Sequence, residues 1–349
     1  MKQEKLSPGQ WGALLWAAAL APAAELLPGA ALNLAGRAAW LAPTAALLFL
    51  LPLLRLGRRG DVRNLRESLT GKVLLTGYAL WMVLLVSLRL ALCARRMGWA
   101  GERDGAVWYF LLVLAALALW MGEGRLSPFG RAGQMFLLLL LGAAALVLGL
   151  SAPLVRADRI LPLWTGDILP VVRAGLPAAG CLGWAVLPML LLPVREERSS
   201  RALLWGAGGC LLLTLAQLII IGNLGVGLTA RSAGGFFALT KSVGVEGAFQ
   251  RVESVVAALW MLSDLTLCVA LTHAVGLAGE GAVFHVKRET VSSFALLAGT
   301  GIGLWLLRWG APVEEWNRDW VWLGNLIFCA AAAFGLWRGE SLGKKTKSG

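Results

Sequence analysis

Three ionisable residues, Glu25, Arg89 and Asp264, lie inside long apolar stretches of this sequence. A charged side chain in the hydrocarbon core of a bilayer is costly, and such residues usually belong to a ligand or ion site. We therefore expect all three to line a binding site. Two alternatives stay open: an ion pair that only joins helices, or an Arg89 side chain that reaches out to the membrane surface.

No pattern of residues indicates an enzyme. The two histidines are His273 and His285, and the five cysteines occur singly, without the paired spacing of a zinc site. The run Glu196–Arg201 fits the EExxxR pattern of intramembrane proteases, but that chemistry needs histidine partners that this chain lacks. We therefore expect no catalytic residue, no metal and no cofactor. The net charge is +12, and the basic residues responsible for it lie in short loops between the apolar stretches. This distribution does not indicate nucleic-acid binding, which needs a basic face or a recognisable motif.

The composition is that of a membrane protein. Of the 349 residues, 58% are hydrophobic and 15% are charged, whereas soluble domains are about a quarter charged. The apolar stretches are continuous and about 20 residues long, which suits helices that cross a bilayer. The sequence predicts an all-α integral membrane protein, a single membrane domain with ten spans. These are residues 9–33, 38–56, 72–95, 105–122, 132–154, 172–194, 202–224, 252–277, 290–308 and 318–337.

The basic residues predict an orientation. Most of the 32 Lys and Arg residues fall on the side of the N-terminus if the ten spans alternate. Basic loops favour the cytoplasm. We therefore expect a multi-pass protein of the cell membrane with both ends in the cytoplasm and the loop 225–251 outside.

Proline and glycine interrupt the first and sixth spans, around Pro22 and around Gly180 and Gly183. Ordinary kinks are one explanation. Two interrupted spans that lie five apart also indicate an inverted repeat of five plus five helices, broken in helices one and six. On this interpretation the repeats cover approximately residues 9–154 and 172–337.

Several short segments follow one another along the chain in a distinctive order and spacing. They are Leu6–Gln10, Leu26–Pro28, Ala35–Leu41, Leu88-Arg89, Gly130–Gly133, Ile168–Val171 and Phe249–Glu253, the last followed by Trp260. In this order they resemble the spore germination permease family, the B subunits of nutrient-germinant receptors. That family belongs to the amino acid–polyamine–organocation transporter superfamily, whose fold is LeuT-like. Two segments depart from the family pattern: Gly183-Trp184 stands where relatives often carry glycine–glutamate, and Phe237-Ala238 where they carry Phe-Pro.

The resemblance implies a receptor subunit in the spore inner membrane that binds an amino acid or similar small nutrient and signals germination. It implies two partner subunits, an A-type subunit with a cytoplasmic domain and a C-type lipoprotein. A secondary amino-acid transporter of the same fold is the alternative. The ligand would lie near the bilayer midplane, held by free backbone groups of the broken helices. The expected site residues are Ala21, Pro22, Glu25, Arg89, Gly180, Gly183, Trp184 and Asp264, with Trp184 making the pocket smaller or more apolar.

Overall fold

The structure is a computed structural model that describes most of the chain. The described residues are 5–57, 65, 68–100, 107–123, 125–161, 163–195, 199–232, 234–242, 252–280 and 287–345. This part of the chain is almost entirely helical, as its composition predicts. Eight stretches are long and apolar enough to cross a membrane; the first, Pro8–Leu56, contains two helices, and Val107–Gly122 is a shorter apolar helix. The predicted multi-pass, all-α architecture is confirmed.

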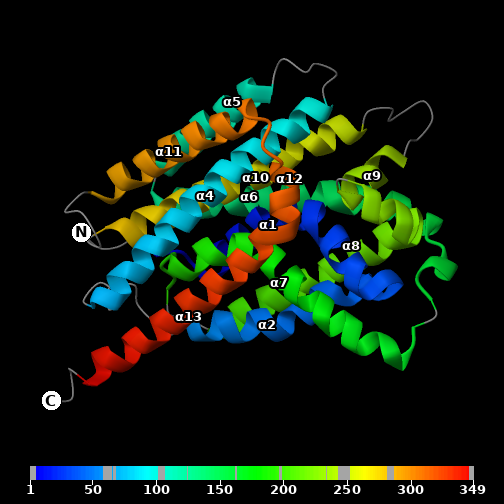
Figure 1. The fold of residues 1–349 in the computed structure, drawn as a ribbon, viewed down its shortest axis with the longest axis horizontal. Helices are drawn as coiled ribbons and strands as arrows, with labels where there is room; N and C mark the ends of the chain where they lie inside the picture. The colour runs from blue at the N-terminus through cyan, green and yellow to red at the C-terminus, as the bar shows by residue number, and fades with distance from the viewer. Residues whose placement is uncertain are drawn as a thin grey trace.

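Ten long helices lie in the described part of the chain (Figure 1). They are α1 (Pro8–Ala35), α2 (Ala42–Gly57), α4 (Leu69–Ala100), α5 (Val107–Gly122), α6 (Leu126–Ser151), α7 (Ile168–Leu191), α8 (Ser199–Arg231), α10 (Val252–Gly279), α11 (Arg288–Arg308) and α13 (Trp322–Lys345). Shorter elements connect them: a 3-10 turn (Gly36–Leu41), α9 (Gly235–Ser242), α12 (Val313–Trp316) and a π turn (Asn317–Val321).

Local sequence sets both ends of α1. Ser7 Oγ accepts from the backbone N–H of Gln10 at 3.2 Å, and Gln10 Oε1 accepts from the N–H of Ser7 at 3.0 Å. This reciprocal capping box, with Pro8 in the first turn, begins the helix. Gly36 ends it with a φ of 53°, a conformation that glycine adopts without strain.

Helices α1, α7 and α10 form the interior of the bundle. Buried residues extend along α1 from Trp11 to Ala35. In the most hydrophobic segment of α7 and of α10, 89% of the residues are buried, against 22–50% in the spans that contain α4, α6, α8, α11 and α13. A helix that is apolar on every side must be covered by neighbouring helices or by lipid. In Figure 1, α1 and α7 accordingly cross the middle of the bundle, with α5 and α11 along one edge and α2 and α13 along the other.

Helix pairing follows two related sets of five. Helix α1 packs on α6 and α8, and α7 makes the corresponding contacts with α13 and α2. Helices α4 and α5 pack against each other in the first set, as α10 and α11 do in the second. This is the arrangement expected of the five-plus-five, LeuT-like fold. The repeat boundaries near residues 9–154 and 172–337 remain a prediction.

The expected breaks in helices one and six are not present. Helix α1 runs continuously through Pro22 and Pro28, and α7 runs continuously through Pro177 and Pro188. Proline lacks a backbone N–H and so leaves backbone groups of the preceding turn without their helical partners. In membrane helices, neighbouring side chains and helices readily form hydrogen bonds with these groups. Beside Pro22, the N–H of Ala21 donates to Ser263 Oγ of α10 at 2.9 Å.

Irregular backbone occurs elsewhere in the described chain. Gly225, near the end of α8, has a φ of 77° and a ψ of 165°, which interrupts the helical path. The π turn between α12 and α13 is another departure from α-helical geometry. Both lie at the end of the bundle where α4 ends and α10 begins, which we call the α9 end.

The glycines of α7 serve close packing against α13. A Cβ on Gly180 would lie 2.3 Å from the backbone oxygen of Trp322, and one on Gly183 would lie 2.9 Å from Asn325 Cβ. Asn325 is fully buried; its Nδ2 donates to the Gly180 carbonyl at 3.1 Å, and its Oδ1 accepts from Trp81 Nε1 at 3.1 Å. Small residues at such an interface bring two membrane helices into contact.

We expect Gly180→Ala to lower the free energy of unfolding by about 1–3 kcal/mol, because the new methyl group meets backbone atoms that cannot move aside. Gly301→Ala on α11 is the matched control, since a Cβ there meets no atom within 4 Å. Thermal unfolding of both variants in detergent measures the difference. Equal melting temperatures for the two variants would show that α7 and α13 are not in this close contact.

Candidate functional site

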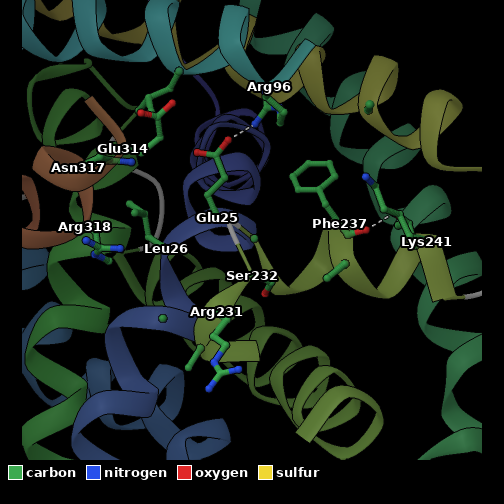
Figure 2. Close-up of a pocket in the computed structure, with 17 residues that line it drawn as sticks. Glu25, Leu26, Arg96, Arg231, Ser232, Phe237, Lys241, Glu314, Asn317 and Arg318 are labelled. Carbon is green, nitrogen blue, oxygen red and sulfur yellow. Dashed lines mark hydrogen bonds and ion pairs between the residues drawn. The ribbon is translucent and has the colours of Figure 1, made fainter. Parts of the chain in front are cut away.

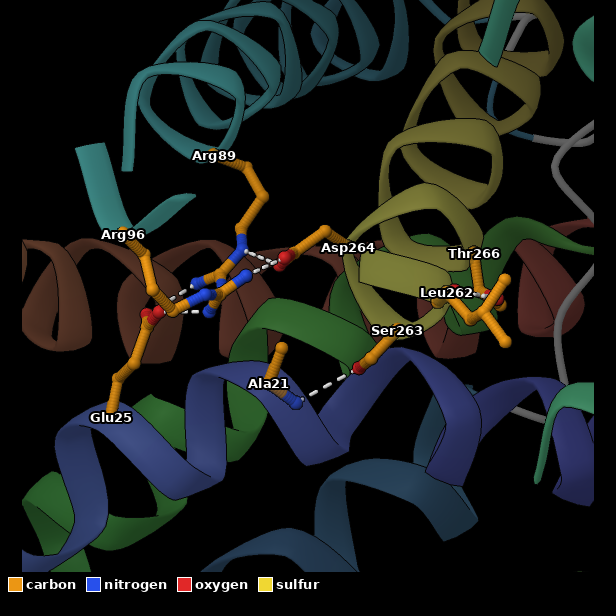
Figure 3. A network of polar contacts seen from close by, with 8 residues as sticks. All are labelled: Ala21, Glu25, Arg89, Arg96, Leu262, Ser263, Asp264 and Thr266. Carbon is orange, nitrogen blue, oxygen red and sulfur yellow. Dashed lines mark hydrogen bonds and ion pairs between the residues drawn. The ribbon is translucent and has the colours of Figure 1, made fainter. Parts of the chain in front are cut away.

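Two arginines of α4 form the centre of the site. Arg89 and Arg96 are seven residues apart, or two helical turns, so both side chains leave the same face of the helix. That face is turned toward α1 and α10, which contribute Glu25 and Asp264 (Figure 3). We call Glu25, Arg89, Arg96 and Asp264 the charged quartet.

The charged quartet is a closed ring of ion pairs. Arg89 Nη1 lies 2.8 Å from Glu25 Oε2, and Arg89 Nε lies 2.5 Å from Asp264 Oδ1. Arg96 donates to the second oxygen of each carboxylate, from Nη1 to Glu25 and from Nη2 to Asp264. Each arginine therefore bridges both acids, and the ring ties α1, α4 and α10 together.

The charged quartet is withdrawn from solvent and has no net formal charge. The side chains of Arg89 and Asp264 are fully buried, and those of Arg96 and Glu25 are 9% and 12% exposed. Burial of four charges is tolerable only when each is paired and hydrogen-bonded. Removal of any one charge would leave a net charge in a low-dielectric interior.

Two aromatic rings lie against the arginines. Arg89 Cζ is 6.0 Å from the ring centroid of Trp184 on α7, and Arg96 Cζ is 5.4 Å from that of Phe237 on α9. The ring of Phe237 also meets Trp260 of α10 edge-on, with centroids 5.8 Å apart. Cations are attracted to aromatic faces at such distances. The rings therefore connect α7 and α9 to the charged quartet.

A cavity of about 470 Å³ lies at the α9 end of the bundle. It reaches the charged quartet through Glu25 and Arg96 (Figure 2). Arg89, Asp264 and Trp184 do not line it. The lining residues are Glu25, Leu26, Gly29, Leu92, Arg96, Ala230, Arg231, Ser232, Gly234, Phe237, Ala238, Thr240, Lys241, Ala257, Glu314, Asn317 and Arg318.

Positive charge exceeds negative charge along this lining. Arg231, Lys241 and Arg318 come from α8, α9 and the π turn, in addition to Arg96 at the floor. The acids of the lining are Glu25, which pairs with the arginines, and Glu314, which accepts from Arg95 at 2.5 Å. Apolar walls and this excess of cations favour a small ligand with an anionic group.

The structure brings together part of the predicted site. Glu25, Arg89 and Asp264 meet in the charged quartet, and Trp184 lies against Arg89. Ala21 and Pro22 are buried on α1, one turn from Glu25. Gly180 and Gly183 are different, because they pack on α13 and do not line the cavity. Whether these residues bind a ligand remains a prediction.

Sequence reasoning missed Arg96, Phe237, Glu314 and Asn317. The predicted third span, residues 72–95, ends one residue before Arg96, whereas α4 continues to Ala100. The seven-residue spacing from Arg89 was the available signal. No sequence signal places α9 or the π turn over the quartet, because both are brought there by long-range packing.

Some predicted features lie outside the described residues. These are Phe249, Gln250 and Arg251 of the family-like segment, Glu196–Arg198 of the protease-like run, and His285. Among the residues that the structure describes, no group of three or more histidines, cysteines or acids is arranged to hold a metal ion.

We expect Asp264→Asn to reduce the free energy of unfolding by about 3–5 kcal/mol, because it leaves two buried arginines facing one acid. The double variant Asp264→Asn/Arg96→Gln restores neutrality and should be more stable than Asp264→Asn alone. Thermal unfolding in detergent measures these two variants and Arg96→Gln alone. Asp158→Asn serves as the control, since that acid is exposed and its loss should change little. A double variant as unstable as the sum of its single variants would contradict the ring.

The family model of the spore germination proteins (Spore_permease) matches residues 99–307. No curated protein matches the sequence. Among solved structures, a Na⁺-coupled sialic acid symporter in a substrate-bound outward-open state superposes with a TM-score of 0.63 and 10% sequence identity, covering 95% of this chain and 79% of that one. That likeness shows a shared transporter fold. Because the family model matches more than half of the sequence, the chain belongs to the spore germination protein family.

Proposed function

We propose that this chain is the membrane subunit of a spore nutrient-germinant receptor and that it binds an amino acid or similar small nutrient in the cavity above the charged quartet. The observation that carries the proposal is the cavity of about 470 Å³ with Glu25 and Arg96 at its floor. Its volume lies within the range of about 300–1,000 Å³ that is typical of small-molecule sites. Membership in the spore germination protein family supports the same conclusion.

Ligand binding changes the partners of Arg96 in this proposal. An anionic group in the cavity competes with Glu25 for the Arg96 guanidinium. Arg96 also pairs with Asp264, so a change at Arg96 alters how α1 is held to α4 and α10. A ligand shifts a conformational equilibrium only by its different affinity for the two states. Here the ligand would bind more tightly to the state in which its own anionic group replaces the Glu25 carboxylate at Arg96.

The proposal includes an orientation and partners. The cavity opens to the outside of the spore inner membrane, with both chain ends in the cytoplasm, because most Lys and Arg residues lie on the N-terminal side. An A-type subunit with a cytoplasmic domain and a C-type lipoprotein receive the signal. Family membership motivates both partners.

Transport of an amino acid is the second candidate, and the transporter fold shared with the symporter favours it. The same cavity would serve. Transport requires access to the charged quartet from both sides of the membrane in turn, whereas sensing requires only a change in how the helices are held.

We expect Glu25→Gln and Asp264→Asn to abolish or strongly weaken the germination response to amino acids in spores that carry the variant in place of the parent chain. Each change removes one carboxylate of the charged quartet and so disturbs the arginines that face the ligand. The control is Glu289→Gln, an exposed acid in the first turn of α11. Immunoblots establish normal expression. If both variants are present at the parent's level and respond like the parent, the carboxylates of the quartet are not needed for the response.

Purification from spore membranes tests the partner assignment. We expect the tagged chain to co-purify with two further membrane-associated subunits and to lose stability when they are absent. The isolated chain in sealed vesicles should not concentrate labelled amino acids. Uptake of a labelled amino acid by the isolated chain would establish the transporter alternative.

A further inference from the structure

The last membrane helix reaches the cavity through a π turn. Residues Val313–Trp316 form α12, Asn317–Val321 form the π turn, and α13 follows from Trp322. Single π turns widen a helix locally and occur frequently at functional sites. Glu314 and Asn317 are three residues apart, and both line the cavity from this element (Figure 2).

Two buried oxygens of this element lack partners among the described residues. Asn317 is 2% exposed, and its Oδ1 accepts no hydrogen bond there. Glu314 uses Oε2 to accept from Arg95 at 2.5 Å, while its buried Oε1 accepts nothing. Buried polar atoms without partners are unfavourable, and native proteins rarely leave them unpaired. Both atoms are acceptors, so a group that satisfies them must donate.

Hydrogen-bond donors and positive charge lie along the rest of the lining. Arg96 lines the floor, and its buried Nε also lacks a partner in the described chain. Arg231 and Lys241 contribute further cations from α8 and α9. Glu314 Oε1 and Asn317 Oδ1 are thus two acceptors, unpaired within the described chain, beside Arg318 of the π turn. Arg96, Arg231 and Lys241 supply donors from other helices. A single small ligand with a donor end and an anionic end would pair with both groups.

We infer that Glu314 and Asn317 form a subsite for the ammonium group of a zwitterionic ligand, and that Asn317 determines the preference for amino over des-amino ligands. The inference rests on the proposed function, because it assigns one end of a ligand in the same cavity. Glu314 already pairs with Arg95 through Oε2, and its free Oε1 is still a carboxylate oxygen, to which a charged donor bonds more strongly than a neutral one. The anionic end of the ligand then faces Arg96.

Ligand-induced stabilisation of the full-length chain, purified in detergent together with the subunits that co-purify with it, tests the inference. Each of the twenty standard amino acids is screened by thermal unfolding, and the tightest binder is compared with the matched carboxylic acid that lacks the amino group. The parent should bind the amino acid at least tenfold more tightly. Asn317→Leu, similar in shape but without an acceptor, should reduce this preference about tenfold, the effect of losing one hydrogen bond to a charged group. Asn317→Asp keeps an acceptor and adds negative charge, so it should retain or increase the preference.

The outcomes separate this inference from the proposed function. Trp320→Phe is the control on the same turn, because Trp320 is 69% exposed and does not line the cavity; it should behave like the parent. If the parent binds no amino acid, amino-acid binding in this cavity and the subsite are both wrong. If the parent prefers the amino form but Asn317→Leu keeps that preference, the subsite alone is wrong. If Asn317→Leu does not fold, a loss of preference in Asn317→Asp overturns the subsite by itself.

Discussion

Charge neutrality in a dry interior is the constraint on which this structure depends. Two arginines of α4 and two acids from α1 and α10 are withdrawn from water and pair in a closed ring. The Coulombic attraction between such charges is strong because the surroundings screen it weakly. The ring therefore fixes three helices relative to one another, and its geometry is sensitive to any new charge that approaches it.

The surrounding helices support that ring without contributing further charge to it. Trp184 of α7 lies against Arg89, and Phe237 of α9 lies against Arg96. Gly180 and Gly183 bring α7 into contact with α13 on another side, where Asn325 joins the two helices. The cavity is thus displaced from the predicted meeting point of α1 and α7 to the α9 end, above Glu25 and Arg96.

The sequence predicted the architecture well because a bilayer permits few solutions. Long apolar stretches must be helices, and the cost of burying charge singled out Glu25, Arg89 and Asp264. The same reasoning failed for Arg96, which stands close to the predicted end of its span. It also predicted a helix break at Gly180 and Gly183, where α7 is continuous and packs against α13. A glycine that interrupts a helix and a glycine that allows close packing of a neighbouring helix cannot be told apart in the sequence. Distinguishing them requires knowing that α13 packs there.

Cysteine accessibility measures most directly whether the charged quartet closes the bundle beneath the cavity. In a cysteine-free background, Gly29→Cys places a thiol on the cavity wall, where a Cβ meets no atom within 4 Å. Ser263→Cys places one beyond the ring, at a fully buried position. A membrane-impermeant maleimide should label Gly29→Cys rapidly and Ser263→Cys only after Glu25→Gln opens the ring. Equal labelling of the two positions in the otherwise unaltered chain would contradict the account.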